Sequence, residues 1–312
     1  MARALDRAGL TIKIGVSLPD EYLAMLDVFV FANPHYSIEL CQDIEKCLQM
    51  KKTKSGIRVI IDLDRDFFGM PSDMPEYEHL GPGNMDRLGV LQTLLAQVDI
   101  VTAPSTALAE KLKQYAKRVE VVPHSWSRSD ILWEKPTPKR TMVHLGIVNS
   151  HLHNKDLSLI RESVKRILVE EKQVLLVAGG DMDLLNAFTG ILDDRKMFVP
   201  IGQARDYPFV FSNFDILLVP LRDIKYNLCK TDLPLLEAGI RHIPWVATDI
   251  PAFQEWGVGG ILAAKKGDWY TALQKLIKNG ELRKELGESG RQKAEQREGD
   301  VVAQRWIEVF TN

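Results

Sequence analysis

The chain has 312 residues, 45% of them hydrophobic and 26% charged, which is an ordinary globular balance and a length that suggests two domains. Lys and Arg number 40 against 42 Asp and Glu, so a net charge of −2 argues against nucleic acid as a partner. The three cysteines form no CxxC pair, which favours reduced thiols in the cytoplasm over disulfides or a zinc site.

The N-terminus lacks the apolar core of a signal peptide, and the longest apolar runs fall short of the roughly 20 residues that span a bilayer. We therefore expect a soluble, cytoplasmic protein. Peripheral association with the inner membrane face stays open.

Short apolar runs alternate with amphipathic stretches along the whole chain. In the first half we expect strands at Ile12–Val16, Val28–Phe31, Val59–Leu63, Ile100–Ala103 and Val119–Val122, with helices at Ser37–Met50 and Met85–Gln97. In the second half we expect strands at Thr141–Leu145, Val174–Ala178, Met197–Val199, Ile216–Val219 and Pro244–Ala247, with helices at Leu157–Val169, Asp232–Ile240 and Trp269–Lys278. This alternation predicts an α/β protein with parallel sheets and right-handed crossovers, built as two Rossmann-like, doubly wound domains.

A domain boundary is expected at residues 134–140, which contain two prolines and four charged residues. The predicted division is a first domain at 1–136, a second at 137–295 and a C-terminal helix with an apolar stripe at 296–312. Residues 3–9 look like a first crossover helix, yet no strand precedes them. Either the first strand of the N-terminal sheet is absent, or the chain is cut from a longer polypeptide.

Polar loops follow several of the predicted strands, and ligands of open α/β sheets bind at the carboxyl ends of strands. After Gly146 the loop offers donors for phosphate oxygens, namely Asn149, Ser150, His151, His153 and Lys155. A plain polar loop, with Asp156 as the cap of the next helix, is an equal alternative. A metal held by the two histidines is disfavoured, because no Cys or carboxylate is spaced to complete its shell.

A second polar and basic loop runs from Pro220 to the helix predicted at 232–240. Thr231 is expected to cap this helix and Pro234 to lie in its first turn, so that its free N–H groups and Lys230 form an anion site. Glu237 borders a packed surface, where its carboxylate needs donors that ribose hydroxyls would supply. Without further context, a surface glutamate on an amphipathic helix is the favoured interpretation.

The predicted first domain has two polar features at strand ends. Asp62, Asp64 and Asp66 would share one face if the strand continued through them, which raises a metal site, but an acceptor-facing polar loop is the preferred interpretation. His35 follows the Val28–Phe31 strand and is a candidate catalytic or acceptor-side residue. A loop histidine with satisfied hydrogen bonds is the competing view.

Several ordered segments resemble one family. Phe214-Asp215-Ile216 leading to Pro220, then Leu236-Glu237-Ala238 and Pro244 to Asp249, resemble the donor domain of GT-B glycosyltransferases, specifically the retaining family 4 enzymes of glycosyl transferases group 1. Residues 98–109, 119–123 and 269–287 are similar to further segments of that family. Residues 62–71 and 153–156 are similar to its branch acting on bacterial surface polysaccharides.

The resemblance implies two domains facing a cleft and transfer of a sugar from a nucleotide-diphosphate sugar to a glycan or lipid-linked acceptor, with retention and without a metal or other cofactor. It implies donor binding by Gly146, His153, Lys155, Ile201, Lys230, Thr231 and Glu237. His35 and Lys230 are the candidate catalytic residues, and Asp64 and Asp66 the candidates on the acceptor side.

Two departures from the family pattern are visible. Cys229 stands where the family usually has the first of two glutamates, and Ile147 and Val148 follow Gly146 where it has an arginine. The alternative function is therefore a non-catalytic, glycosyltransferase-like module that binds a nucleotide or glycan within a larger assembly. A GT-B sugar epimerase would need a pair of acid and base carboxylates that the sequence does not reveal.

Overall fold

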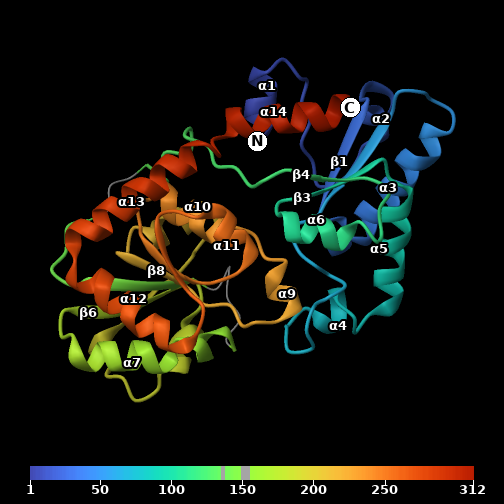
Figure 1. The fold of residues 1–312 in the computed structure, drawn as a ribbon. Coiled ribbons are helices and arrows are strands. Elements are labelled where there is room, and N and C mark those ends of the chain that lie inside the picture. Colours follow the sequence, from blue (N-terminus) through green and yellow to red (C-terminus); the bar gives the residue numbers. More distant parts are fainter. Residues whose placement is uncertain (135–137, 149–154) are drawn as a thin grey trace. The chain divides into compact units, whose positions relative to one another are not determined.

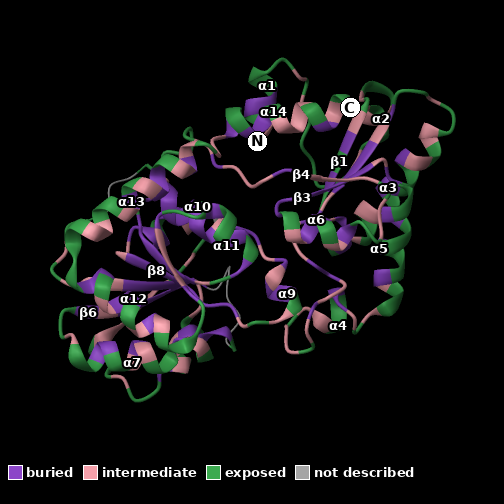
Figure 2. Cartoon of the chain, in the orientation of Figure 1, coloured by how far each residue is buried: buried purple, intermediate pink, exposed green. Residues whose placement is uncertain are grey.

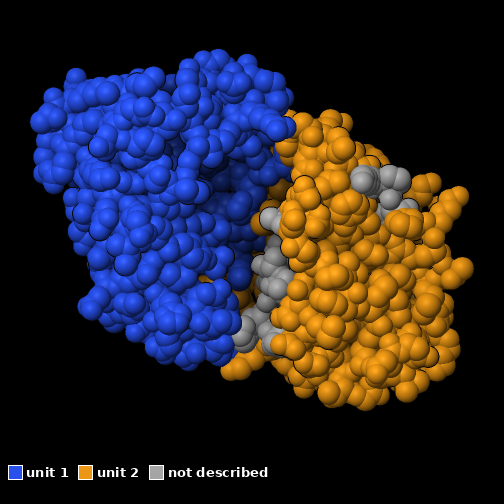
Figure 3. Space-filling model, turned by 180° about the vertical axis from the view of Figure 1, so that it is seen from behind, with its two compact units in different colours: residues 1–126, 228–231, 299–312 blue, residues 127–227, 232–298 orange. Residues whose placement is uncertain are grey.

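The computed structural model describes residues 1–134, 138–148 and 155–312, which form two compact units (Figures 1 and 3). Unit 1 comprises residues 1–126, 228–231 and 299–312, and unit 2 comprises residues 127–227 and 232–298. The domain boundaries expected after residues 136 and 295 stay a prediction, since residue 136 is outside the described part.

Unit 1 is built on a four-stranded parallel sheet in the order β1-β2-β3-β4. The strands are β1 (Val28–Ala32), β2 (Arg58–Asp62), β3 (Ile100–Ala103) and β4 (Val119–Val121). Each crossover advances one strand in the same direction, so right-handed connections put all the crossover helices on one face. These helices are α3 (Ile38–Lys51), α5 (Met85–Gln97) and α6 (Thr106–Leu112). The opposite face needs cover from another part of the chain.

That cover comes from the C-terminal helix α14 (Gly299–Thr311), with α1 (Ala2–Arg7) beside it (Figure 1). Val302 and Val309 of α14 join one core cluster with Ile60 of β2 and Ile100 of β3. Nη1 of Arg58 donates to the carbonyl oxygens of Val309 (3.0 Å) and Phe310 (2.6 Å), which satisfies carbonyls at the helix end that have no partner within the helix. The helix predicted at the C-terminus is therefore present and packs on the sheet.

The strand predicted at Ile12–Val16 is wrong, because these residues form neither a strand nor a helix. Ile12 packs beside α1 and α14, whereas the side chains of Ile14 and Val16 are 82% and 92% exposed. Alternating apolar residues form a strand only where a neighbouring strand supplies hydrogen bonds, and none pairs with this segment. The sheet of unit 1 as described begins at β1.

Unit 2 is built on a six-stranded parallel sheet in the order β10-β9-β8-β5-β6-β7. Its strands are β5 (Val143–Val148), β6 (Val174–Gly179), β7 (Lys196–Val199), β8 (Ile216–Val219), β9 (Trp245–Thr248) and β10 (Gly260–Ala263). The first strand, β5, has β6 on one side and β8 on the other, so the direction of winding reverses there. The predicted α/β class with two parallel sheets is confirmed, and β5 and β8 mark the switch point of unit 2.

Helices cover both faces of this sheet, and the strands between them are largely buried (Figure 2). Helix α7 packs with α12 over the main core cluster of unit 2, while α10 packs with α13. The helices are α7 (Arg161–Glu170), α8 (Tyr207–Phe211), α9 (Lys225–Leu228), α10 (Leu233–Ile240), α11 (Pro251–Trp256), α12 (Lys266–Lys278) and α13 (Gly280–Glu295). Within the described ranges, no helix is both long and apolar enough to cross a membrane.

Two glycines let α10 and α13 approach each other closely. A Cβ on Gly239 of α10 would lie 2.6 Å from the carbonyl oxygen of Gly290 on α13, and one on Gly287 would lie 2.1 Å from the carbonyl oxygen of His242. Both neighbours are backbone atoms, which cannot rotate away as a side chain could. Close helix packing is therefore a sufficient reason for glycine at position 239.

The substitution Gly239→Ala is expected to lower the free energy of unfolding of unit 2 by about 1–3 kcal/mol, because the added methyl group forces the two helices apart. Gly267→Ala in α12 is the matched control, since a Cβ there meets nothing within 4 Å. Chemical denaturation of both variants checks the prediction. An equal or greater stability of Gly239→Ala would show that the two helices can separate freely.

Candidate functional site

The carboxyl ends of β5 and β8 are where a ligand is expected in unit 2, because the winding of an open α/β sheet reverses between such strands and leaves a crevice there. After β5 the described chain resumes at Lys155, and after β8 it enters the loop that begins at Pro220. His153 lies outside the described residues, so its donor-binding role stays a prediction. Lys155 is exposed and directly precedes a short 3-10 helix at Asp156–Leu159.

A buried carboxylate joins these two loops. Asp156 is 2% exposed, and its Oδ1 accepts from the backbone N–H of Arg222 (2.9 Å), from Nε of Arg222 (3.1 Å) and from Nδ2 of Asn227 (3.2 Å). Nδ2 of Asn227 also donates to the carbonyl oxygen of Arg222 at 3.0 Å. Asp156 thus fixes the loop after β8 to the segment after β5, and it does not cap α7, which begins only at Arg161.

Lys230 and Thr231 lie in the segment 228–231, which belongs to unit 1, and the side chain of Lys230 is partly exposed. The prediction that Thr231 caps the following helix is wrong. Leu233 is the first helical residue of α10, so the N-cap is Asp232, whose Oδ2 accepts from Nη2 of Arg297 at 2.7 Å. Pro234 does lie in the first turn, as expected.

Glu237 is buried, with 7% of its surface exposed, so it is not a plain surface glutamate. The hydroxyl of Tyr207, the first residue of α8, donates to its Oε2 at 2.9 Å. The ring of Tyr207 lies edge-on to those of Trp133 and Phe211, which hold it in place. The protein therefore supplies one of the donors that the sequence assigned to a ribose, and Tyr207 is a neighbour that sequence reasoning missed.

Gly146 and Ile201 are the remaining predicted donor-binding residues of unit 2. Gly146 lies inside β5, which continues to Val148, rather than at the strand end as predicted. A Cβ there would lie 2.2 Å from the ring of Phe214, so this ring accounts for the glycine without a ligand. Ile201 is partly exposed in the loop after β7, at the edge of the sheet. Donor contacts of both residues stay predictions.

His35 follows β1 in unit 1 and is 1% exposed. Its Nε2 lies 2.8 Å from the carbonyl oxygen of Leu80, and a carbonyl only accepts, so Nε2 carries the proton. Burial lowers the pKa of the imidazole, and Arg87 adds to this effect, so the neutral form of His35 is favoured. Among the described residues Nδ1 has no hydrogen-bond partner. A catalytic role for His35 stays a prediction, and it would have to use this nitrogen as an acceptor.

Asp62, Asp64 and Asp66 do not share one face of a strand, because β2 ends at Asp62. Oδ1 of Asp62 accepts from the hydroxyl of Thr102 at 2.6 Å, Oδ1 of Asp64 from Nε of Arg65 at 3.2 Å, and Oδ1 of Asp66 from the N–H of Gly69 at 2.9 Å. In the part of the chain that the structure describes, no group of three or more His, Cys, Asp or Glu residues is arranged to hold a metal. The acceptor-side roles of Asp64 and Asp66 stay predictions.

Burial raises the pKa of Asp62 from 3.8 to about 6, with the nearby Asp64 adding to the effect. The folded state therefore binds the proton of Asp62 more tightly than the unfolded state does. This contribution to the free energy of unfolding is fully present below pH about 4 and is lost as the pH rises through about 6. Asp62→Asn is therefore expected to gain roughly 2–3 kcal/mol over the native chain at pH 7.5 and nothing at pH 3.5. Denaturation at both pH values checks this. A gain that does not depend on pH would contradict it.

Cys229, at the position of the missing family glutamate, is buried in unit 1. The hydroxyl of Ser105 donates to its carbonyl oxygen at 3.5 Å, and its Sγ lies 4.0 Å from the carbonyl oxygen of Ala107. Burial raises the pKa of the thiol to about 11. A neutral, buried thiol does not replace a carboxylate that would accept hydrogen bonds from a ligand.

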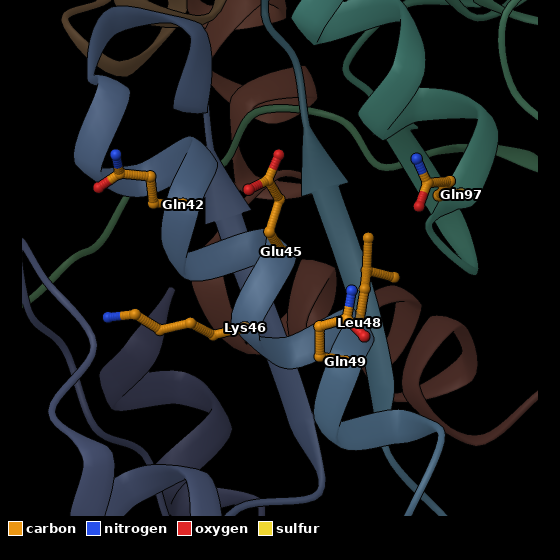
Figure 4. Close-up of a pocket in the computed structure, with 6 residues that line it drawn as sticks. All are labelled: Gln42, Glu45, Lys46, Leu48, Gln49 and Gln97. Carbon is orange, nitrogen blue, oxygen red and sulfur yellow. The ribbon is translucent and has the colours of Figure 1, made fainter.

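A separate pocket of unit 1 lies along α3 and the end of α5 (Figure 4). It is lined by Gln42, Glu45, Lys46, Leu48, Gln49 and Gln97. It lies on helices rather than at the carboxyl ends of strands, and no predicted site residue lines it. We therefore expect the ligand at the carboxyl ends of the strands, where the predicted site residues lie, and not in this pocket.

The chain is similar to known proteins in part of its sequence and in its fold. Residues 139–279 match the family model described as glycosyl transferases group 1. No curated protein matches the chain. Among solved structures the chain is similar to TarM, with a TM-score of 0.66 and 12% identity, over 91% of this chain and 55% of that one. The chain thus spans about half the length of TarM.

Two further structures are matched over more of their length. HepE of Anabaena, in complex with UDP, has a TM-score of 0.66 and 14% identity over 94% of this chain and 81% of that chain. A glycosyltransferase of Rickettsia africae ESF-5 has a TM-score of 0.65 and 10% identity over 99% and 86%. At these identities the likeness shows the fold alone, which is the GT-B fold expected from the sequence. The resemblance to glycosyl transferases of group 1 is therefore confirmed, and residues 139–279 are the part of the chain that carries the family match.

Proposed function

We propose that the chain transfers a sugar from a nucleotide-diphosphate sugar to a glycan or lipid-linked acceptor in polysaccharide biosynthesis, with retention of configuration and without a metal. The observation that carries the proposal is the buried carboxylate of Glu237 on α10, inside the region that matches group 1 glycosyl transferases. The structure of HepE, which shares the fold, holds UDP. A nucleotide is accordingly the ligand we assign to unit 2.

The roles follow from the chemistry of the donor. When the sugar leaves, negative charge develops on the departing diphosphate, and cations or N–H groups aimed at it lower the barrier. In this proposal Lys155 and Lys230 supply the cations. The N–H groups of Leu235 and Leu236 in the first turn of α10 already donate to the carbonyl oxygen of Asp232, at 2.9 and 3.0 Å, and Pro234 has none. Glu237, oriented by the hydroxyl of Tyr207, accepts from the ribose, and the loop at Ile201 borders the base. Asp64 and Asp66 face the acceptor in this proposal.

Calorimetric titration tests the ribose assignment. The panel contains UDP, GDP, ADP and CDP together with their 2′-deoxy forms. Glu237→Ala is expected to weaken the best ribonucleotide about tenfold, the effect of one hydrogen bond to a charged group, and to abolish its preference over the deoxy form. Glu162→Ala on the exposed side of α7 is the matched control. Unchanged affinity and an intact preference in Glu237→Ala would remove the assignment.

The second candidate is a module that binds a nucleotide without transferring a sugar. The observation in its favour is Cys229, because its buried, neutral thiol stands in place of a family glutamate. Such a module would bind nucleotide sugars but release no nucleoside diphosphate from them. Restoring the family residue with Cys229→Glu would then be expected to create turnover that the native chain lacks.

A further inference from the structure

The loop after β8 carries an arginine whose attachment is unusual for a surface residue. Arg222 is the third residue after β8, at the switch point of unit 2, and both its backbone N–H and its Nε donate to the same carboxylate oxygen of Asp156. Two attachments from one residue fix the path of the chain and the plane of the guanidinium together. We propose that Arg222 binds the diphosphate of the donor and that Asp156 is the residue that positions it.

The burial of the two partners supports this division of roles. The carboxylate side chain of Asp156 is 3% exposed, whereas the side chain of Arg222 is 24% exposed, so the pair runs from the interior to the surface of unit 2. Nδ2 of Asn227 donates both to Asp156 and to the carbonyl oxygen of Arg222, so the later part of the loop after β8 is also bonded to this pair. A guanidinium whose backbone and Nε are both fixed to one buried carboxylate is preorganised for a ligand.

The chemistry of the side chain selects the ligand. Guanidinium is planar, stays charged at all ordinary pH values and presents five N–H donors that match phosphate oxygens in pairs. Lys155 directly precedes Asp156 in the chain and is exposed, so the segment after β5 carries a second cation. Two cations at the carboxyl ends of β5 and β8 suit a ligand with two phosphates. This inference rests on the proposed function, because it names a residue of the same donor site.

The test compares ligands that differ only in phosphate. UDP, GDP and ADP, each with its monophosphate and its nucleoside, are titrated into the native chain and into Arg222→Gln, Arg222→Lys and Asp156→Asn. Arg222→Gln keeps a donor for Asp156 and removes the charge. It is expected to weaken diphosphate binding about 10–100-fold and leave nucleoside binding unchanged. Arg222→Lys should retain part of the diphosphate affinity, and Asp156→Asn should lose part of it.

Arg166→Gln is the matched control, because Nε of Arg166 also pairs with a carboxylate, that of Glu170 at 2.7 Å, but on the exposed surface of α7. It should bind all ligands as the native chain does. The proposal is overturned if Arg222→Gln keeps full diphosphate affinity, or if diphosphate, monophosphate and nucleoside all weaken equally, as loss of a purely structural bond would cause. If Arg222→Gln does not fold, the same comparison on Arg222→Lys decides. A native chain that binds none of the nucleotides would instead refute the proposed function, and this inference with it.

Discussion

Lys230→Ala is expected to lower the kcat of sugar transfer by about 10²–10³-fold, with a much smaller effect on the KM for the donor. Lys230 lies three residues before the first residue of α10. The charge of its ammonium group would stabilise the diphosphate as negative charge develops on it. An interaction that strengthens in the transition state reduces kcat when it is removed. Steady-state kinetics with the nucleotide sugar that binds most tightly measures both constants.

Lys172→Ala is the control for Lys230→Ala. Lys172 is exposed in the turn before β6, at the amino ends of the unit 2 strands. This variant therefore removes the same charge far from the carboxyl ends of those strands. It should keep native kcat and KM. The role of Lys230 would have to be abandoned if its alanine variant, with unchanged thermal unfolding, turned over at the native rate.

Val302→Asp is expected to unfold unit 1 or to destabilise it by more than about 3 kcal/mol. Val302 on α14 is 3% exposed and packs with Ile60, Ile100 and Val122, on the face of the sheet that the crossover helices leave bare. Burying an aliphatic side chain contributes about 1.5–3 kcal/mol, and an unpaired carboxylate in its place adds a desolvation penalty. Hydrogen exchange at the amides of β2 and β3 measures the effect within unit 1.

Its neighbour in the chain supplies the control. Val301 is 56% exposed, so Val301→Asp should change the stability by no more than about 0.5 kcal/mol. Protection of the unit 2 strands should be the same in both variants, because Val302 belongs to the core of unit 1. If Val302→Asp left the exchange of β2 and β3 at the native rate, α14 would not be part of that core.

The strands that are buried on both faces were the most predictable part of the fold. Ile100–Ala103 and Ile216–Val219 are continuous apolar runs, and both were predicted with the bounds that the structure has. Ile12–Val16 alternates apolar residues with Lys13 and Gly15 and is not a strand, because an apolar pattern in the sequence does not report whether a partner strand exists. The strand β10 was missed, since Gly260–Ala263 is short and only partly buried.

The candidate site was predictable only in outline. Strand-end loops could be named from the sequence, but Asp156, Arg222 and Asn227 meet across 66 and 71 positions of chain, which no local pattern reports. The same holds for Tyr207, which approaches Glu237 from a helix 30 positions away. Side chains brought together by the sheet order become visible only once that order is known.

Release of nucleoside diphosphate from nucleotide sugars tests the central claim most directly. The native chain and Lys230→Ala are incubated with UDP-, GDP- and ADP-linked sugars, with water alone and with p-nitrophenyl glycosides as acceptors. We expect the native chain to release the diphosphate of at least one donor, faster with an accepted glycoside, and Lys230→Ala to release it about 10²–10³-fold more slowly. Binding of a nucleotide sugar with no release under any of these conditions would contradict sugar transfer.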